Sequence, residues 1–93
     1  MSDVAAALER LHQRFLERAI ADLALLRAAS SATDSDLQAT IHRLAGAAGT
    51  FGHHQLSELA KSAEDALIQR TADAPVRLAA LVEALARLTH APR

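Results

Sequence analysis

The residue of this sequence with the clearest chemical potential is His42, within the segment Ile-His-Arg-Leu-Ala-Gly-Ala-Ala-Gly-Thr-Phe-Gly over 41–52. Four apolar residues follow helical spacing and predict the buried stripe of a helix: Leu37, Ile41, Leu44 and Ala48. His42 is about 100° from Ile41 around the axis, so its imidazole is expected to face water. Gly46 stands one turn later, where a side chain would lean over the imidazole. Because glycine inside a helix costs about 1 kcal/mol relative to alanine, an imidazole that must stay uncovered is a reason to keep glycine here; the alternative is an ordinary solvated histidine.

Two groups of the following helix are expected to assist this imidazole. A glycine-bracketed break near position 53 predicts a helical hairpin, in which residues equally distant from the turn lie level. Glu64 and His42 are each eleven residues from position 53, so the Glu64 carboxylate can accept the Nδ1–H and leave Nε2 free as the nucleophile. Lys61 is level with Ala45 by the same count, and its charge could stabilise an anion on the imidazole. The alternatives are that Glu64 is solvated or pairs with Lys61 along the helix.

The segment from His42 to Gly52 resembles the signature of histidine-containing phosphotransfer (HPt) domains, the relay modules of multistep two-component signalling. The family pattern is roughly His-x-Leu-Lys-Gly-small-small-x-x-(Leu/Phe)-Gly, followed on the next helix by leucines and a Glu or Gln. This sequence continues with Leu56, Leu59 and Glu64. The Gly-Thr-Phe-Gly ending also resembles the phosphorylatable domain of chemotaxis kinases.

The resemblance implies that His42 takes a phosphoryl group from an aspartyl phosphate on the receiver domain of a hybrid sensor kinase and passes it to the aspartate of a response regulator. The receiver would supply Mg²⁺ and a lysine, so the chain needs no cofactor of its own. Gly46 would let the receiver's active site close over His42. The alternative is an adaptor bundle that binds receiver or kinase domains without phosphotransfer. Kinase activity of the chain itself is not expected, because no Gly-rich nucleotide loop or ATP-binding domain fits within 93 residues.

One position departs from the family pattern. Where the family usually has lysine, three residues after the histidine, this sequence has Ala45. We expect Lys61, or Arg43 beside the histidine, to supply the missing positive charge. Slower transfer, or a cation supplied by the partner, are the alternatives.

Four amphipathic segments predict an all-α fold, an antiparallel four-helix bundle with up-down-up-down topology, in one domain over 1–93. The first segment runs from about Asp3 to Ala29. The second begins at a capping box of Ser35 and Gln38, after a polar break, and ends near 49–52. The apolar stripes of the last two segments are Leu56, Leu59, Ala60, Ala63 and Leu67, then, after Pro75, Leu78, Leu81, Val82, Leu85 and Leu88.

Two apolar residues, Leu16 and Ile20, fall beside the main face of the first segment. They predict either a kink that divides the helix into two or an exposed patch. With Ile68, one turn beyond Glu64, they could form a docking surface for receivers. The equal alternative is that neighbouring helices cover all three side chains.

The composition favours a small helical domain and excludes several classes of function. Hydrophobic residues make up 51% of the chain, mostly 23 alanines and 15 leucines. Ten basic and eleven acidic residues nearly cancel, so partners are not expected to include nucleic acid or a membrane surface. No membrane span or signal peptide is expected, and the absence of cysteine suits a reducing compartment. We expect a cytoplasmic monomer, with the Arg-rich and Ala-rich composition typical of bacteria with GC-rich genomes.

A metal site is not expected. The remaining histidines show neither an H-x-x-x-H spacing nor a setting like that of His42: His12, His53, His54 and His90. The chain also has no cysteine, whereas a metal site needs three or four converging ligands.

Overall fold

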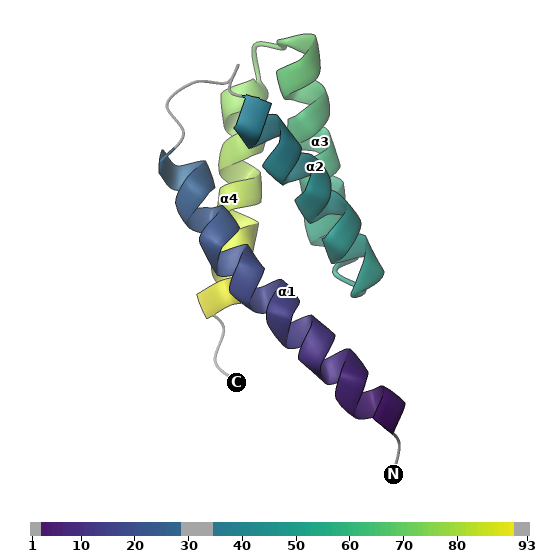
Figure 1. The fold of residues 1–93 in the computed structure, drawn as a ribbon. Helices are drawn as coiled ribbons and strands as arrows, with labels where there is room; N and C mark the ends of the chain where they lie inside the picture. The colour runs from purple at the N-terminus through teal and green to yellow at the C-terminus, as the bar shows by residue number, and fades with distance from the viewer. Residues whose placement is uncertain (1–2, 29–34, 91–93) are drawn as a thin grey trace.

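The protein consists of four α-helices, as seen in a computed structural model that describes residues 3–28 and 35–90 (Figure 1). The helices are α1 (Asp3–Ala28), α2 (Ser35–Thr50), α3 (His54–Gln69) and α4 (Ala74–His90). No strand occurs among the described residues. The predicted all-α four-helix bundle is therefore confirmed, with closely matching ends for the first two helices. The predicted polar break lies outside the described residues, and Ser35, predicted as a cap, is the first residue of α2.

The core is formed by the apolar stripes that the helical spacing predicted. The largest side chains that are less than 2% exposed come from α2 and α4: Leu37, Ile41, Leu44, Leu81 and Leu85. Side chains of this size contribute about 1.5–3 kcal/mol each when buried. Where α2 faces α3, the fully buried residues include Ala48, Ala60 and Ala63. Such small side chains let two helices approach closely, so α2 and α3 form the tightest pair of the bundle.

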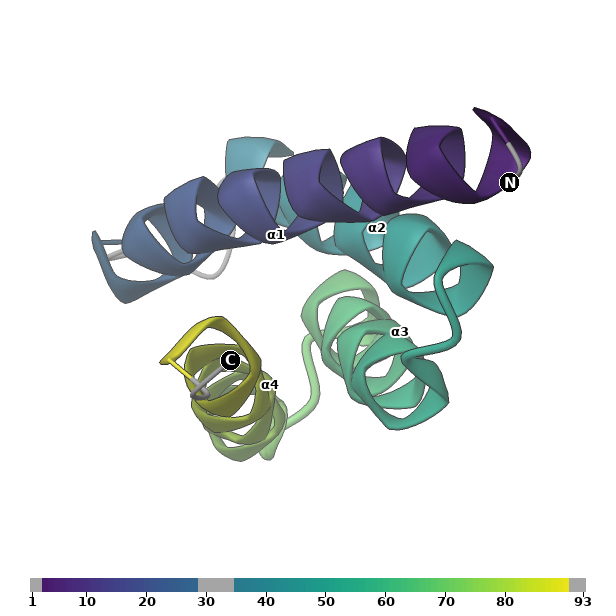
Figure 2. The ribbon, with the colours of Figure 1, turned by 90° about the horizontal axis from the view of Figure 1, so that it is seen from below.

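The helices form a closed ring in which each packs against two neighbours. α2 packs against α1 and α3, and α4 packs against α3 and α1, as can be followed in the view from below, where α1 crosses over the other helices (Figure 2). The α1–α2 interface is the least extensive of the four. The helix that carries His42 is thus held firmly on its α3 side and more loosely on its α1 side.

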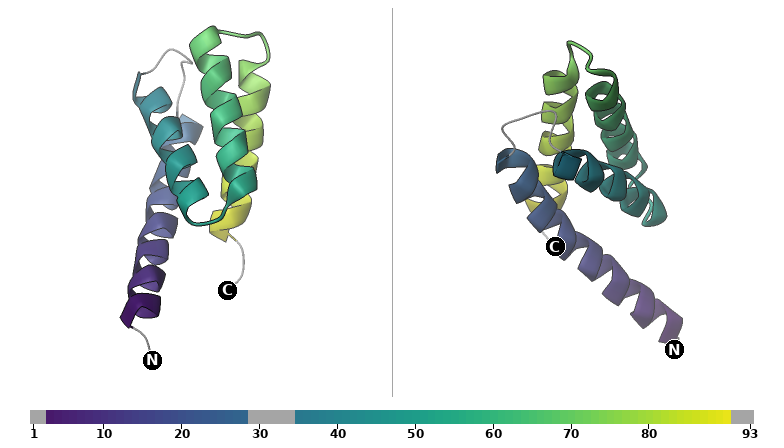
Figure 3. Two further views of the ribbon diagram at one scale, coloured as in Figure 1. Left: turned by 90° about the vertical axis from the view of Figure 1, so that its right-hand side faces the viewer. Right: turned by 45° about the horizontal axis from the view of Figure 1, so that its top comes forward.

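One helix, α1, is much longer than the other three and projects beyond the end of the bundle (Figure 3). It is continuous from Asp3 to Ala28, so the predicted alternative of a kink into two helices is wrong. Its apolar stripe continues onto the projecting part, where Leu8 is 56% and Leu11 47% exposed. The projection gives the molecule its elongated dimensions of 51 × 21 × 20 Å.

The turn between α2 and α3 fixes the hairpin that carries the candidate site. Gly52 adopts a left-handed conformation with φ 81°, which glycine reaches without the steric cost of a Cβ. The amide of His53 donates to the carbonyl of Ala48 at 2.8 Å, and the amide of Gly52 donates to the carbonyl of Gly49 at 3.2 Å. This pair of hydrogen bonds is a Schellman motif, which ends a helix and reverses the chain. The turn predicted near position 53 is therefore present and brings α3 back along α2.

Candidate functional site

The imidazole of His42 projects from the bundle and is held from one side. Ile41 is fully buried, whereas the side chain of His42 is 76% exposed. The Nδ1 atom of His42 lies 2.9 Å from Oε2 of Glu64 on α3. The Glu64 side chain is only 19% exposed, so its carboxylate is anchored against the bundle. His42 and Glu64, which were predicted to lie level because they are equally distant from the α2–α3 turn, are therefore in direct contact.

This contact determines which imidazole nitrogen is free. A carboxylate accepts hydrogen bonds, so Nδ1 carries the proton and donates it to Glu64. Neutral imidazole has a single N–H, so Nε2 keeps its lone pair and is directed away from Glu64. A histidine in this state can act as a nucleophile toward an electrophile approaching from solvent. The alternatives of a solvated Glu64, or of a Glu64–Lys61 ion pair, are not what the structure contains.

A second contact holds α2 close to α3 beside the site. The Ser57 hydroxyl is buried and donates to the backbone carbonyl of Ala45 at 2.8 Å. A Cβ added at Gly49 would lie 3.4 Å from the Ser57 Oγ atom, which is about van der Waals contact, so α3 lies directly against this position of α2. Ala45, at the position where the family usually has lysine, is only 4% exposed. A lysine at residue 45 would therefore begin inside the α2–α3 contact. Sequence reasoning missed Ser57, although its place on the α2-facing flank of α3 is visible in the helical spacing.

The two candidate cations have different surroundings. Lys61 is exposed on α3, and among the described residues it forms no ion pair. Arg43 instead donates to both carboxylate oxygens of Asp22 on α1, from Nη2 at 3.0 Å and from Nη1 at 3.4 Å. Arg18 lies at 3.8 Å from the same carboxylate. To approach His42, Arg43 would have to leave its ion pair with Asp22. Lys61 would have no such ion pair among the described residues to break.

Asp22 was not singled out by sequence reasoning. It is 4% exposed and is the single charged residue among the buried described residues. A signal for it exists in the sequence, because Asp22 falls on the buried stripe of α1, seven residues after Phe15. A carboxylate at such a buried position needs a cation as a partner, and Arg43 on the facing helix supplies one.

Gly46 lies on the outward face of α2, one turn from His42. A Cβ built at this position would meet no atom within 4 Å. Nothing inside the bundle therefore requires glycine here, and an added methyl group would not touch His42. Any steric requirement for a bare position must arise from a molecule that approaches the site.

The three residues predicted as an apolar docking patch do not form one surface. Leu16 packs against the core, while Ile20 is 51% and Ile68 59% exposed. Arg18 marks the α2-facing flank of α1 through its contact with Asp22, and Ile20 is about 200° further around that helix. Ile20 therefore lies on the opposite flank from the His42 site. Of the three residues, only Ile68, one turn beyond Glu64, lies near the His42 site.

A second histidine pair joins α1 to the α2–α3 turn. Nε2 of His12 lies 3.1 Å from Nε2 of His53, and both rings contact Phe15, with Phe51 beside His12. The pKa of His53 is lowered by partial burial and by the neighbouring His12. Sequence reasoning gave these histidines no particular setting, because their proximity depends on how α1 packs across the turn.

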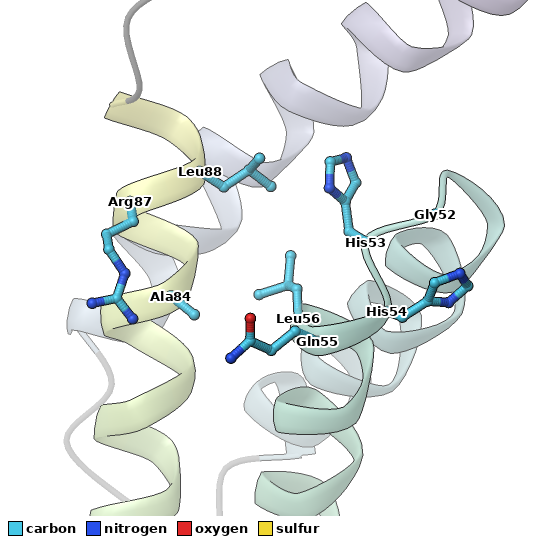
Figure 4. A pocket seen from close by; sticks show the side chains of 8 residues that line it. All are labelled: Gly52, His53, His54, Gln55, Leu56, Ala84, Arg87 and Leu88. Atoms are coloured by element: carbon cyan, nitrogen blue, oxygen red, sulfur yellow. The ribbon is translucent and has the colours of Figure 1, made fainter.

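The cavity beside this turn is separate from the His42 site. It has a volume of about 410 Å³ and is lined by residues from the α2–α3 turn, the start of α3 and α4, including His53, Gln55 and Arg87 (Figure 4). Neither His42 nor Glu64 lines it. No cluster of three metal-ligating side chains occurs within residues 3–28 and 35–90.

Comparisons with known proteins bear on this arrangement. In the part of the chain that the structure describes, no helix has the length and apolar character needed to cross a membrane. No curated protein and no solved structure matches the chain. The family model of the Hpt domain matches residues 10–91, which include α2, α3 and α4 in full, α1 from Arg10 onward, and every residue of the His42 site. The chain therefore belongs to the Hpt domain family.

Proposed function

We propose that this Hpt domain relays a phosphoryl group from the aspartyl phosphate of one receiver domain to His42, and from His42 to the aspartate of a second receiver. The observation that carries the proposal is the His42–Glu64 pair: an imidazole that is 76% exposed and has its Nδ1 bound to an anchored carboxylate. The donor is the receiver of a hybrid sensor kinase and the acceptor is a response regulator. The domain acts as a cytoplasmic monomer of bacterial origin.

In the loading step, the lone pair of His42 Nε2 attacks the phosphorus of the aspartyl phosphate. The Nε2–P bond forms while the P–O bond to the aspartate breaks, and the aspartate leaves as a carboxylate. The product is a phosphorylated imidazolium that retains the proton on Nδ1. Glu64, at 2.9 Å from that nitrogen, stabilises the positive charge as it develops, so its contribution is larger in the transition state than before the reaction.

In the unloading step, a carboxylate oxygen of the second receiver attacks the phosphorus and the Nε2–P bond breaks. The electron pair returns to Nε2, and the Nδ1 proton stays with the imidazole, which is neutral again. Phosphoryl transfer depends chiefly on in-line positioning and on neutralising the phosphoryl oxygens. The receiver supplies Mg²⁺ and a lysine for this purpose, so the Hpt domain needs to present only an accessible, oriented nucleophile.

The counter-charge on the Hpt side is assigned to Lys61. Lys61 is on the same flank of α3 as Glu64, and it is exposed, whereas Arg43 is bound by Asp22. We expect Lys61→Ala to shorten the phosphohistidine lifetime or slow the transfer rate by about threefold, and Arg43→Ala to leave the phosphohistidine lifetime close to that of the wild type, because Arg43 is bound by Asp22. If both variants keep the wild-type lifetime and rate, the cation comes entirely from the receiver.

The test of the relay is to mix ³²P-labelled receiver domains from the source organism with the wild-type protein and with His42→Gln. The expected result is an acid-labile, base-stable label on the wild type alone. His54→Gln, which removes an exposed histidine of α3, is the matched control and should be labelled like the wild type. Receivers that bind without transferring label would instead support the adaptor function, and label on His42→Gln would contradict the assigned residue.

A further inference from the structure

Arg43, the residue after the phosphoacceptor, forms an ion pair with Asp22 in which the carboxylate is buried and the guanidinium is partly exposed. Asp22 occupies a position on the inner face of α1 that is otherwise lined by apolar side chains such as Ala19, Leu23 and Leu26. Replacing a buried ion pair with apolar residues is often neutral or stabilising. Stability alone therefore gives little reason for a carboxylate at this position, and fixing one arrangement of the helices is the better-attested use of such a pair.

Two consecutive residues of α2 hold it from opposite sides. His42 contacts α3 through Glu64, and Arg43 contacts α1 through Asp22. Since neighbouring helical residues are about 100° apart, turning α2 about its axis in either direction lengthens one of the two contacts. The pair of contacts therefore defines the rotation of α2 within the bundle.

Small rotations matter for the His42 contact. An atom about 6 Å from a helix axis moves by about 1 Å when the helix turns by about 10°. Such a movement would carry the 2.9 Å Nδ1–Oε2 distance beyond hydrogen-bond length. The other polar link to α3, from Ser57 to the carbonyl of Ala45, ends on a backbone atom near the axis and so resists rotation weakly. On the α1 side, where the interface is least extensive, the Asp22–Arg43 pair supplies the restraint.

We propose that Asp22 is a positioning residue for His42: by binding Arg43 it sets the rotation of α2 at which Glu64 holds the Nδ1 proton and Nε2 faces outward. This inference rests on the proposed function of His42, but its first readout does not require phosphotransfer. The same ion pair keeps the Arg43 guanidinium on the α1 flank of α2, away from the face on which Gly46 leaves the site open.

The test measures the tautomer of His42 in Asp22→Asn by long-range ¹H–¹⁵N NMR of the imidazole at alkaline pH. The wild type should place the proton on Nδ1, and Asp22→Asn should shift a measurable share of it to Nε2. Phosphorylation of His42 by phosphoramidate, which transfers its phosphoryl group to Nε2 and releases ammonia, should slow by about three- to tenfold. Arg43→Gln breaks the same pair from its more exposed partner and should reproduce both effects even if Asp22→Asn does not fold.

The matched control is Glu83→Gln, which removes a carboxylate from the exposed ion pair with Arg87 on α4. It should leave the tautomer and the phosphoramidate rate unchanged. If Asp22→Asn and Arg43→Gln lower only the unfolding free energy and keep the Nδ1 tautomer, Asp22 is structural and the inference is wrong. If the tautomer shifts but no receiver ever phosphorylates the wild type, the positioning role stands and the relay function fails.

Discussion

Two histidine contacts among the described residues are similar in length but differ in their chemistry. Nδ1 of His42 meets a carboxylate at 2.9 Å on an exposed face, whereas Nε2 of His12 meets Nε2 of His53 at 3.1 Å inside an aromatic cluster. In the first contact the carboxylate occupies one nitrogen and leaves the other open to solvent. In the second contact, the two Nε2 atoms share a hydrogen bond, so the Nε2 of each ring already has a partner. The comparison indicates that the partner of a histidine and the direction of its free nitrogen, rather than the presence of an imidazole, decide whether it can be a nucleophile.

The largest expected effect separates these two contacts by substitution. His42→Gln should abolish phosphohistidine formation, because no other group at the site offers a free imidazole nitrogen. His12→Gln should leave the labelling rate within about twofold of the wild type and lower the unfolding free energy by about 1 kcal/mol, through loss of its hydrogen bond and ring packing. Labelling with a phosphorylated receiver and urea denaturation measure the two quantities. A His12→Gln variant that folds but accepts no label would show that His12 also takes part in phosphotransfer.

The next effect concerns the carboxylate that distinguishes the His42 contact. Glu64→Gln keeps the size of the side chain but removes the negative charge that faces Nδ1. We expect the rate of His42 phosphorylation to fall by about tenfold or more, because charge stabilisation in the transition state is lost. Asp65→Asn removes a charge from an exposed neighbour on α3 and serves as the control. Equal rates of His42 phosphorylation in the wild type and in Glu64→Gln would mean that the Glu64 carboxylate does not assist the reaction.

A smaller effect tests whether the open surface around His42 serves a partner. Gly46→Ala meets no atom of the chain, so it should raise the unfolding free energy by about 0.5–1 kcal/mol. Transfer from a receiver should nevertheless slow several-fold, while phosphorylation by phosphoramidate stays at the wild-type rate. Slowing with both donors would mean that the methyl group acts on the imidazole itself, and slowing with neither would leave Gly46 without a role in access.

Sequence reasoning predicted the His42 contact but not the His12–His53 contact, for a physical reason. Glu64 meets His42 because both belong to one hairpin, whose turn at Gly52 fixes the level of every residue on either side. Such local geometry can be counted from the sequence. The contact of His12 with His53 instead depends on the position of α1 along the α2–α3 hairpin. Counting residues from the turn does not specify that position.

The same distinction explains two further differences between expectation and structure. Asp22 meets Arg43 across the α1–α2 interface, so the charge that sequence reasoning considered for the phosphate is bound elsewhere. Ile20 was grouped with Ile68 by apolar character, but α1 packs with these residues on different flanks of the bundle. Contacts within the α2–α3 hairpin could be predicted, whereas contacts that involve α1 required the packed structure.

The smallest effect is the pH response of the His12–His53 contact. The pKa of His53 is lowered from its ordinary value of 6.5, first by burial and then by the nearby His12. Between the lowered and the ordinary value the unfolded chain binds more protons than the folded chain, so the unfolding free energy rises with pH. This contribution is complete above about pH 6.5 and is lost as the pH falls through the lowered folded pKa.

Other ionisable side chains lie near the pair. Glu9 lines the groove beside His12, while His54 and Arg87 line the cavity beside His53. The measurement is therefore the difference in urea midpoint between pH 7.5 and pH 5.5, about one unit either side of the ordinary histidine pKa, for wild type, His53→Gln and the control His54→Gln. The difference should shrink in His53→Gln and persist in His54→Gln. If all three proteins respond alike, the contact does not respond to protonation, and the two histidine pairs differ only in exposure and partner.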